Sequence, residues 1–169
     1  MVNELGWQVV PITRSQDWSA FDCGESELNE WLRAYAVQSE KSGGARVFAV
    51  VDADNCGVAY YAISAQSIVA QGAPERLRKG MPKHPIPVLL IARLAVDKRF
   101  KGQGLGAGLL KNALLRCLNA SSEVGVRAVI VDAKNDAARR FYEYFDFEAF
   151  PDDPKRLFLL IKDLRRSIR

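Results

Sequence analysis

Cysteine, histidine and long apolar runs are scarce in this chain of 169 residues. Cys23, Cys56 and Cys117 are odd in number and far apart, so they fit neither a disulfide framework nor a zinc site, and we expect no metal. No apolar run reaches the roughly 18 residues that span a bilayer, and the first residues lack the basic and apolar segments of a secretory signal. We therefore expect a cytoplasmic protein with no membrane partner.

Charge of either sign is close to balanced, with 24 basic and 20 acidic residues and a net charge of +4. This excess is too small to demonstrate a nucleic-acid partner. The basic residues are nevertheless clustered in residues 76–84 and 98–101, at Arg139 and Arg140, and at the C-terminal end. If some of these clusters converge near a ligand cleft, they would hold a polyanion through phosphate contacts; a solvated surface is the alternative.

The length favours one compact domain over residues 1–169. Apolar periodicity predicts strands at residues 7–12, 46–51, 58–69, 88–96, 126–133 and 156–164. It predicts helices at 26–39, with Ser26 as the cap, at 104–119, and from a cap at Asn135 or Asp136 to about 145, with one helical turn at 75–79. Strands 46–51 and 58–69 should form an antiparallel hairpin around the turn at Asp54 and Asn55. This order indicates an α/β domain with a mixed sheet.

A glycine-rich stretch, Lys-Gly-Gln-Gly-Leu-Gly at residues 101–106, lies where a predicted strand gives way to a predicted helix. Glycines at such a junction allow a tight turn, and the free N–H groups and dipole of the helix N-terminus favour a phosphate. The glycines fall at 102, 104, 106 and 108, which is not the spacing of the Rossmann fingerprint. No Gly-Lys-Ser/Thr follows, so the triphosphate-binding P-loop is excluded as well.

A second motif follows the next predicted strand: Asn135, Ala138, Phe141 and Tyr142, then Phe-Asp-Phe at 145–147. Together the two motifs resemble the GCN5-related N-acetyltransferases (GNAT family). The resemblance implies a mixed, mostly antiparallel sheet with a splayed strand pair, flanked by helices, and acetyl-CoA as cofactor. It also implies the contacts to coenzyme A. The pyrophosphate would lie on Lys101, Gly102, Gln103, Gly104, Leu105 and Gly106, the pantetheine arm along Leu94, Ala95 and Val96, and Asn135 and Phe141 near the cofactor.

Tyr142 matches the family's tyrosine that protonates the leaving thiolate. A phenol with a pKa of about 10 can give its proton to a thiolate with a pKa of about 8.5 only when it is positioned for that transfer. By its spacing alone, Tyr142 would instead be a core aromatic residue on the buried face of a helix.

A narrower resemblance covers most of the chain. Phe-Asp-Cys-Gly at 21–24, Trp-Leu-Arg at 31–33, Tyr-Tyr-Ala-Ile-Ser at 60–64 and the run at 85–97 are similar to the acetyltransferase toxins of bacterial toxin–antitoxin modules. The resemblance implies acetylation of the α-amine on charged tRNA, inhibition of translation, a homodimer, and neutralisation by a ribbon-helix-helix antitoxin through which the toxin reaches operator DNA. Candidate tRNA contacts are Arg76, Arg78, Lys79, Arg93, Arg139 and Arg140.

The strand leading into the glycine stretch has no acidic residue, and Arg93 is its only charge. An α-amine has a pKa near 7.7–8.0, well below that of a lysine, and an ester at the carboxyl group lowers it further, so a strong base is not needed. Asp132 is a possible base or a structural acid, and Arg93 is a phosphate contact or an arginine that reaches solvent. His84 is either loop surface or an RNA contact. Two other functions remain open: acetylation of a small amine or a protein N-terminus, and an antitoxin-binding co-repressor with little catalysis.

Overall fold

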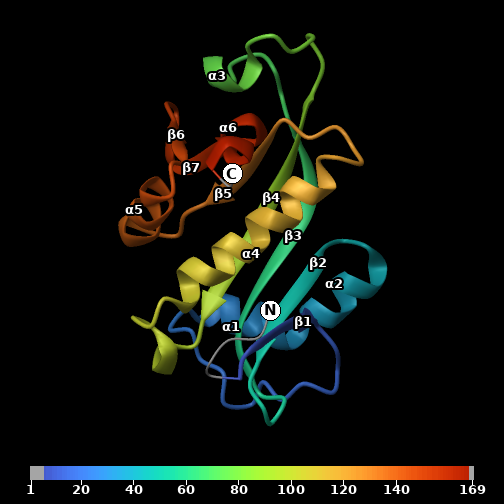
Figure 1. Cartoon of the computed structure of the whole chain (residues 1–169), viewed down its shortest axis with the longest axis vertical. Coiled ribbons are helices and arrows are strands. Elements are labelled where there is room, and N and C mark those ends of the chain that lie inside the picture. The colour runs from blue at the N-terminus through green and yellow to red at the C-terminus, as the bar shows by residue number, and fades with distance from the viewer. Residues whose placement is uncertain (1–5, 168–169) are drawn as a thin grey trace. The chain divides into compact units, whose positions relative to one another are not determined.

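A computed structural model describes residues 6–167 (Figure 1). Its elements, in chain order, are β1 (Gln8–Pro11), α1 (Ser26–Ala34), α2 (Ala36–Ser42), β2 (Arg46–Val51), β3 (Gly57–Ile68), α3 (Glu75–Arg78), β4 (Ile86–Val96), the 3-10 turn η1 (Lys98–Phe100), α4 (Leu105–Ala120), β5 (Ala128–Asp132), α5 (Asp136–Tyr144), β6 (Glu148–Phe150), β7 (Asp153–Leu160) and α6 (Ile161–Ser167). No helix among these residues is both long and apolar enough to cross a membrane.

The chain forms two compact units that share three elements. The first unit contains the described residues up to Ser64 together with Ala92–Ala113, and the second contains Ala65–Ile91 and the chain from Leu114 onward. Strands β3 and β4 and helix α4 run through both units. The strands are hydrogen-bonded in the order β1-β2-β3-β4-β5-β7-β6, in which β4 and β5 are parallel and the pairs β1–β2, β2–β3, β5–β7 and β6–β7 are antiparallel. The α/β fold with a mixed, mostly antiparallel sheet is therefore confirmed.

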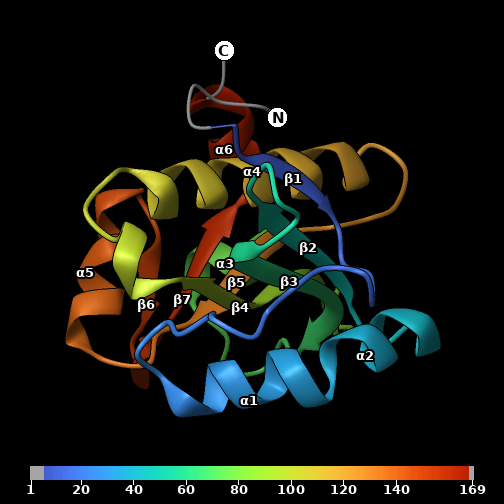
Figure 2. The same cartoon turned by 90° about the horizontal axis from the view of Figure 1, so that it is seen from below.

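In the first unit, α1 and α2 cover one face of β2 and β3, and the start of α4 lies over the other face (Figure 2). Tyr60 and Tyr61, adjacent on β3, point to these opposite faces. Tyr60 belongs to the apolar cluster beneath α1 and donates its hydroxyl hydrogen to the Leu28 carbonyl oxygen at 2.7 Å. The Tyr61 hydroxyl bonds to the side chain of Asn112 on α4. Because successive side chains of a strand point to opposite faces, these two tyrosines hold α1 against one face of the sheet and α4 against the other.

In the second unit, a core cluster joins α3 to β4, β5 and β7. Ala73 and Leu77 pack with Ile86, Ile130 and Phe158. Pairing of β4 with β5 runs from Val88↔Ala128 to Ile91↔Val131, although β4 continues to Val96. The end of this pairing agrees with the splayed strand pair that the family resemblance implies.

The predicted helix at 26–39 is wrong, because the structure contains two helices that break at Tyr35, whose φ is −127°. Ser26 is also not the cap: Glu25 occupies that position and makes no capping hydrogen bond through its side chain. Apolar spacing continues across the break and cannot reveal it. By contrast, Asn135 caps α5 as predicted, since its side-chain oxygen accepts from the Ala138 N–H at 2.9 Å.

The C-terminal part contains the largest differences from the sequence-based prediction. The predicted strand at 156–164 is β7 only up to Leu160, and the remainder is the start of α6. Ile161 and Leu164 are buried at helical spacing, three residues apart, which a short apolar run does not distinguish from a strand. Strand β6, three residues long, was not predicted. The hairpin of β2 and β3 and the helical turn of α3 were predicted correctly.

Candidate acyl-transfer site

The glycine turn links η1 to α4 in the first unit. Gly102 and Gly104 have φ values of 82° and 78°, in the left-handed region that side chains other than glycine adopt only with strain. A Cβ atom on either residue would meet no other atom within 4 Å, so open space faces both. Lys101 and Gln103 are exposed here, whereas the Leu105 side chain is buried and belongs to the core. An anion at this turn would therefore contact the backbone and the exposed side chains of Lys101 and Gln103.

Lys101 does more than place a positive charge at the turn. Its ammonium group donates a hydrogen bond to the Cys23 carbonyl oxygen at 2.8 Å. The Lys98 N–H donates to the Asp22 carbonyl oxygen at 2.9 Å, so two residues of this segment hold the loop that precedes α1. The Phe-Asp-Cys-Gly motif at 21–24 is thereby attached to the glycine turn.

Asp97, whose residue exposure is 0%, organises the same junction. Its carboxylate accepts a bidentate pair from the Arg99 guanidinium at 3.0 and 2.9 Å, and it also accepts from the backbone N–H groups of Arg99 and Asp22. Burial favours the neutral acid, but the hydrogen bonds from Arg99 and the backbone outweigh it and lower the pKa of Asp97. The carboxylate therefore stays charged and joins the turn to residue 22.

Arg93 lies on β4 above the ring of Trp31 from α1, with its guanidinium carbon 4.1 Å from the ring centroid. Trp31 in turn stacks on Tyr60 at 6.0 Å. Desolvation lowers the pKa of Arg93, and no carboxylate in the described part of the chain forms an ion pair with it. Arg93 is thus a half-buried cation that rests on an aromatic ring and has no acidic partner among the described residues, an arrangement that favours the predicted phosphate contact.

Three residues after Arg93 were also predicted to contact the cofactor. Leu94 is half-buried, whereas Ala95 and Val96 are buried. Their side chains belong to the packing of the first unit, so a contact with an extended ligand would come from the backbone of β4.

In the second unit, Tyr142 lies on α5 with 7% of its surface exposed. The rings of Phe141 and Phe147 flank it, with centroids 5.3 and 5.5 Å away. Burial, with a smaller contribution from the Asp132 charge, raises the pKa of Tyr142 to about 12. The phenol therefore keeps its proton at neutral pH, as a proton donor must.

Asp132 and the cap of α5 complete this part of the site. Asp132 is exposed at the end of β5 and pairs with Arg156 at 3.2 Å. This ion pair fits the structural alternative for Asp132 at the end of the strand. Asn135 is exposed at the first turn of α5, and Phe141 is half-buried on the same helix.

The predicted tRNA contacts divide by their partners. Arg76 pairs with Glu148 and Asp163, and Arg139 pairs with Asp136 and Glu143, so both guanidinium groups are neutralised locally. Three further cations are exposed and have no acidic partner among the described residues: Arg78, Lys79 and Arg140.

Several residues of the site were not predicted as functional. Trp31 and Asp97 appeared only within the runs that resemble the toxins, and Cys23 contributes a carbonyl oxygen. The signal that could have revealed them was the Phe-Asp-Cys-Gly motif, because its apolar Phe21 and Cys23 must be buried against another part of the chain. Cys117 is buried, and burial raises the pKa of its thiol to about 12.

The features of the first unit fit coenzyme A. Two glycines in the left-handed region present backbone N–H groups and open space, and the adjacent cationic side chain suits a pyrophosphate. The second unit contributes a buried, protonated phenol, which suits a leaving thiolate. Each unit thus carries a feature that is typical of acyltransferases with a thioester donor.

Comparison with known proteins gives the family. The acetyltransferase (GNAT) domain matches residues 44–158, more than half of the chain. A tRNA-acetylating toxin of Mycobacterium tuberculosis is 43% identical over 157 residues, 93% of each chain. This protein belongs to the GNAT acetyltransferase family, whose acyl donor is acetyl-CoA.

Solved structures of the toxin AtaT have the same fold. AtaT in complex with acetyl-methionyl-tRNAfMet superposes with a TM-score of 0.87 at 25% identity, covering 96% of this chain and 99% of AtaT. AtaTR bound with acetyl-CoA gives 0.86 at 26% identity, covering 97% and 99%. The AtaT–AtaR complex bound to DNA gives 0.80 at 25% identity, covering 96% and 99%.

Proposed function

We propose that this protein is a toxin that transfers the acetyl group of acetyl-CoA to the α-amine of the amino acid on charged tRNA and so blocks translation. The observation that carries the proposal is the position of Arg93 on β4, the strand that leads into the glycine turn. Its guanidinium lies over the ring of Trp31 and has no acidic partner among the described residues. An acceptor whose amine is largely neutral at pH 7 needs no carboxylate there, and an RNA acceptor carries phosphates that a cation binds. The 43% sequence identity with a tRNA-acetylating toxin supports the same acceptor.

The residues divide the work as follows. When bound, acetyl-CoA supplies an acetyl group activated as a thioester. The N–H groups at 102–106, with Lys101 and Gln103, hold the pyrophosphate, and the backbone of Leu94 to Val96 aligns the pantetheine arm, with Asn135 and Phe141 beside the cofactor. The acceptor nitrogen forms a bond to the acetyl carbon and loses a proton to water, the carbon–sulfur bond breaks, and Tyr142 gives its phenolic proton to the departing sulfur. The Tyr142 phenolate then takes a proton back from water, so the proton lost by the amine balances the one gained by the thiol.

Arg93 binds a phosphate of the acceptor, and Arg76, Arg78, Lys79, Arg139 and Arg140 are proposed as further contacts to tRNA. Because Arg76 and Arg139 already have acidic partners, their substitution should weaken tRNA binding less than substitution of Arg78 or Arg140. We also propose that the chain acts in the cytoplasm as a single-domain protomer of a homodimer. A ribbon-helix-helix antitoxin would neutralise it and carry it to operator DNA, as the antitoxin complexes of AtaT suggest.

A translation reaction tests the activity directly. Added protein and acetyl-CoA should stop protein synthesis, and mass spectrometry of the aminoacyl end should show one added acetyl group. Continued synthesis with unmodified charged tRNA would overturn the proposal. Release of free thiol with small amines or peptides, but not with charged tRNA, would instead identify the alternative acceptors.

Arg93 is tested by Arg93→Lys, which keeps the charge but loses the planar stack on Trp31. We expect a higher KM for charged tRNA and an unchanged KM for acetyl-CoA. Equal effects on both constants would assign Arg93 to the fold rather than to the acceptor.

A further inference from the structure

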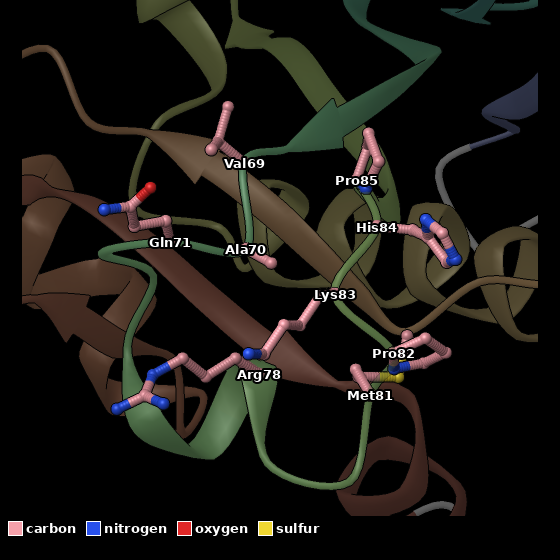
Figure 3. Close-up of a pocket in the computed structure, with 9 residues that line it drawn as sticks. All are labelled: Val69, Ala70, Gln71, Arg78, Met81, Pro82, Lys83, His84 and Pro85. Atoms are coloured by element: carbon pink, nitrogen blue, oxygen red, sulfur yellow. The ribbon is translucent and has the colours of Figure 1, made fainter.

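The long loop between β3 and β4 encloses a pocket in the second unit (Figure 3). Residues 69–71 form one side, and Arg78 with residues 81–85 forms the other. Its volume is about 610 Å³, within the range of pockets that hold small ligands or parts of larger ones.

The charged and titratable side chains that line this pocket are all basic. Arg78, Lys83 and His84 line it, and no acidic residue does. Arg78 uses its Nε to donate to the Ala73 carbonyl oxygen at 3.2 Å, which leaves its two terminal nitrogens for other acceptors. Neither Arg78 nor Lys83 forms an ion pair with a carboxylate in the part of the chain that the structure describes, in contrast to Arg76 two residues earlier.

The walls of the pocket are fixed by the core beneath them. Arg127 donates from its guanidinium to the carbonyl oxygens of Leu77, Arg76 and Lys79, which holds the end of α3. Leu77 is fully buried in the apolar cluster of this unit. Pro82 and Pro85 restrict the backbone on either side of Lys83 and His84. The basic side chains are therefore presented by a preformed loop, which lowers the entropic cost of binding.

The three basic side chains do not converge on one point. Figure 3 shows Lys83 extending across the loop, the guanidinium of Arg78 directed away from it, and the His84 ring turned to the other side. A single phosphate would be held by converging groups, whereas separated cations suit successive phosphates of one strand. Met81 and Pro82 add an apolar wall for a ribose or a base.

We propose that this pocket binds the backbone of an RNA strand, with Lys83 and Arg78 on successive phosphates and His84 at the rim. The inference rests on the proposed function, since charged tRNA is the RNA that would reach the pocket. It adds Lys83 and His84 to the residues that hold the substrate.

Binding of uncharged tRNA to Lys83→Ala, measured over a series of salt concentrations, tests the proposal. At about 0.1 M salt we expect the dissociation constant to rise roughly 3- to 10-fold, and the slope of log K against log salt to fall in magnitude by about one, as for the loss of one phosphate contact. Lys41→Ala, an exposed lysine on α2, is the matched control and should change neither quantity. Because Lys83 is exposed, both variants should unfold at the temperature of the wild-type protein.

An unchanged tRNA affinity and salt slope for Lys83→Ala would overturn the proposal. So would tight binding of AMP that is lost in Lys83→Ala, since a single-nucleotide site is not a strand site. Uncharged tRNA cannot be acetylated, so the measurement is independent of catalysis. A loss of affinity in a protein with no acetyltransferase activity would support the pocket while the proposed function fails. Unaltered affinity in an active protein would reject the pocket alone.

Discussion

The Lys101 ammonium group donates a hydrogen bond to the Cys23 carbonyl oxygen at 2.8 Å, across 78 residues of sequence. This contact joins the proposed cofactor turn to the loop that begins α1, and α1 carries the Trp31 on which Arg93 rests. Lys101, which was predicted to contact the cofactor phosphate, thus also holds the loop that precedes α1. The Phe-Asp-Cys-Gly motif, the glycine turn and Arg93 are therefore connected within the first unit.

Lys101→Met should therefore affect both acetyl-CoA binding and the stability of the protein. Loss of the charge at the turn should raise the KM for acetyl-CoA, and loss of the hydrogen bond should lower the free energy of unfolding by roughly 1 kcal/mol. Lys98→Ala is the control, because Lys98 forms an exposed ion pair with Asp22 that contributes little. Kinetics with each substrate varied in turn, with thermal unfolding, checks both effects. If Lys98→Ala behaves like Lys101→Met, the effect belongs to surface charge.

Tyr142→Phe should lower kcat by roughly 100- to 10,000-fold, the usual contribution of a positioned proton donor, and leave acetyl-CoA binding intact. No hydrogen bond of its hydroxyl to a described residue is present, so the variant should fold normally. Tyr144→Phe removes the same atom from a residue that is 82% exposed on the same helix and should retain full activity. Equal rates for the two variants would leave Tyr142 as a core aromatic residue. Expression of each variant in growing cells provides a second measurement, since only Tyr142→Phe should relieve growth arrest.

Gly104→Ala should lower the free energy of unfolding by about 1 kcal/mol, because its φ of 78° strains any residue with a Cβ. The added methyl group enters the open space at the glycine turn, where the pyrophosphate is proposed to bind. The KM for acetyl-CoA should therefore rise even under conditions in which the variant is fully folded. Gly108→Ala lies inside α4, where a Cβ meets no other atom, and should stabilise the protein by up to about 1 kcal/mol. Denaturant unfolding of both variants measures this difference in sign. A Gly104→Ala variant with normal stability would contradict the left-handed conformation.

Alkaline pH should destabilise the fold through Tyr142. Its pKa is about 12 in the folded protein and 10 in the unfolded chain, so between these values the folded state binds more protons. The stabilisation is complete below pH 10 and is lost as the pH rises through 12, about 2–3 kcal/mol in total. Unfolding of Tyr142→Phe should show a shallower decline over this interval. An identical decline would assign the effect to other groups, such as Tyr60, whose pKa burial also raises.

Asp97→Asn should destabilise the junction by about 1–3 kcal/mol, because a buried carboxylate with four donors loses its charge. The pKa of Asp97 is lowered on folding, so its contribution is present above its ordinary value of 3.8 and is lost as the pH falls below it. The free energy of unfolding of the variant should therefore be lower at neutral pH and should fall less steeply as the pH is lowered. The same acid profile in the variant and the wild-type protein would contradict this role.

Some elements followed from local patterns alone. The hairpin of β2 and β3, the glycine turn and the Asn135 cap depend on turn residues and on spacing within a few positions, so the sequence predicts them. The break at Tyr35 does not, because helical apolar spacing continues across it, and the change from β7 to α6 does not, because apolar residues there suit either a strand or a helix. Burial against the rest of the unit decides between them.

The sequence alone determined the chemistry of the two motifs: glycines that allow a left-handed backbone, a tyrosine one strand later, and a β4 without acidic residues. Only the tertiary structure decided which cations remain available. Arg76 looked equivalent to Arg78, yet acidic residues 72 and 87 positions away neutralise Arg76. Lys101 likewise acquired a carbonyl partner in a distant loop. Charge is a property of a residue type, but its availability depends on neighbours that the fold brings together, and spacing along the chain does not encode them.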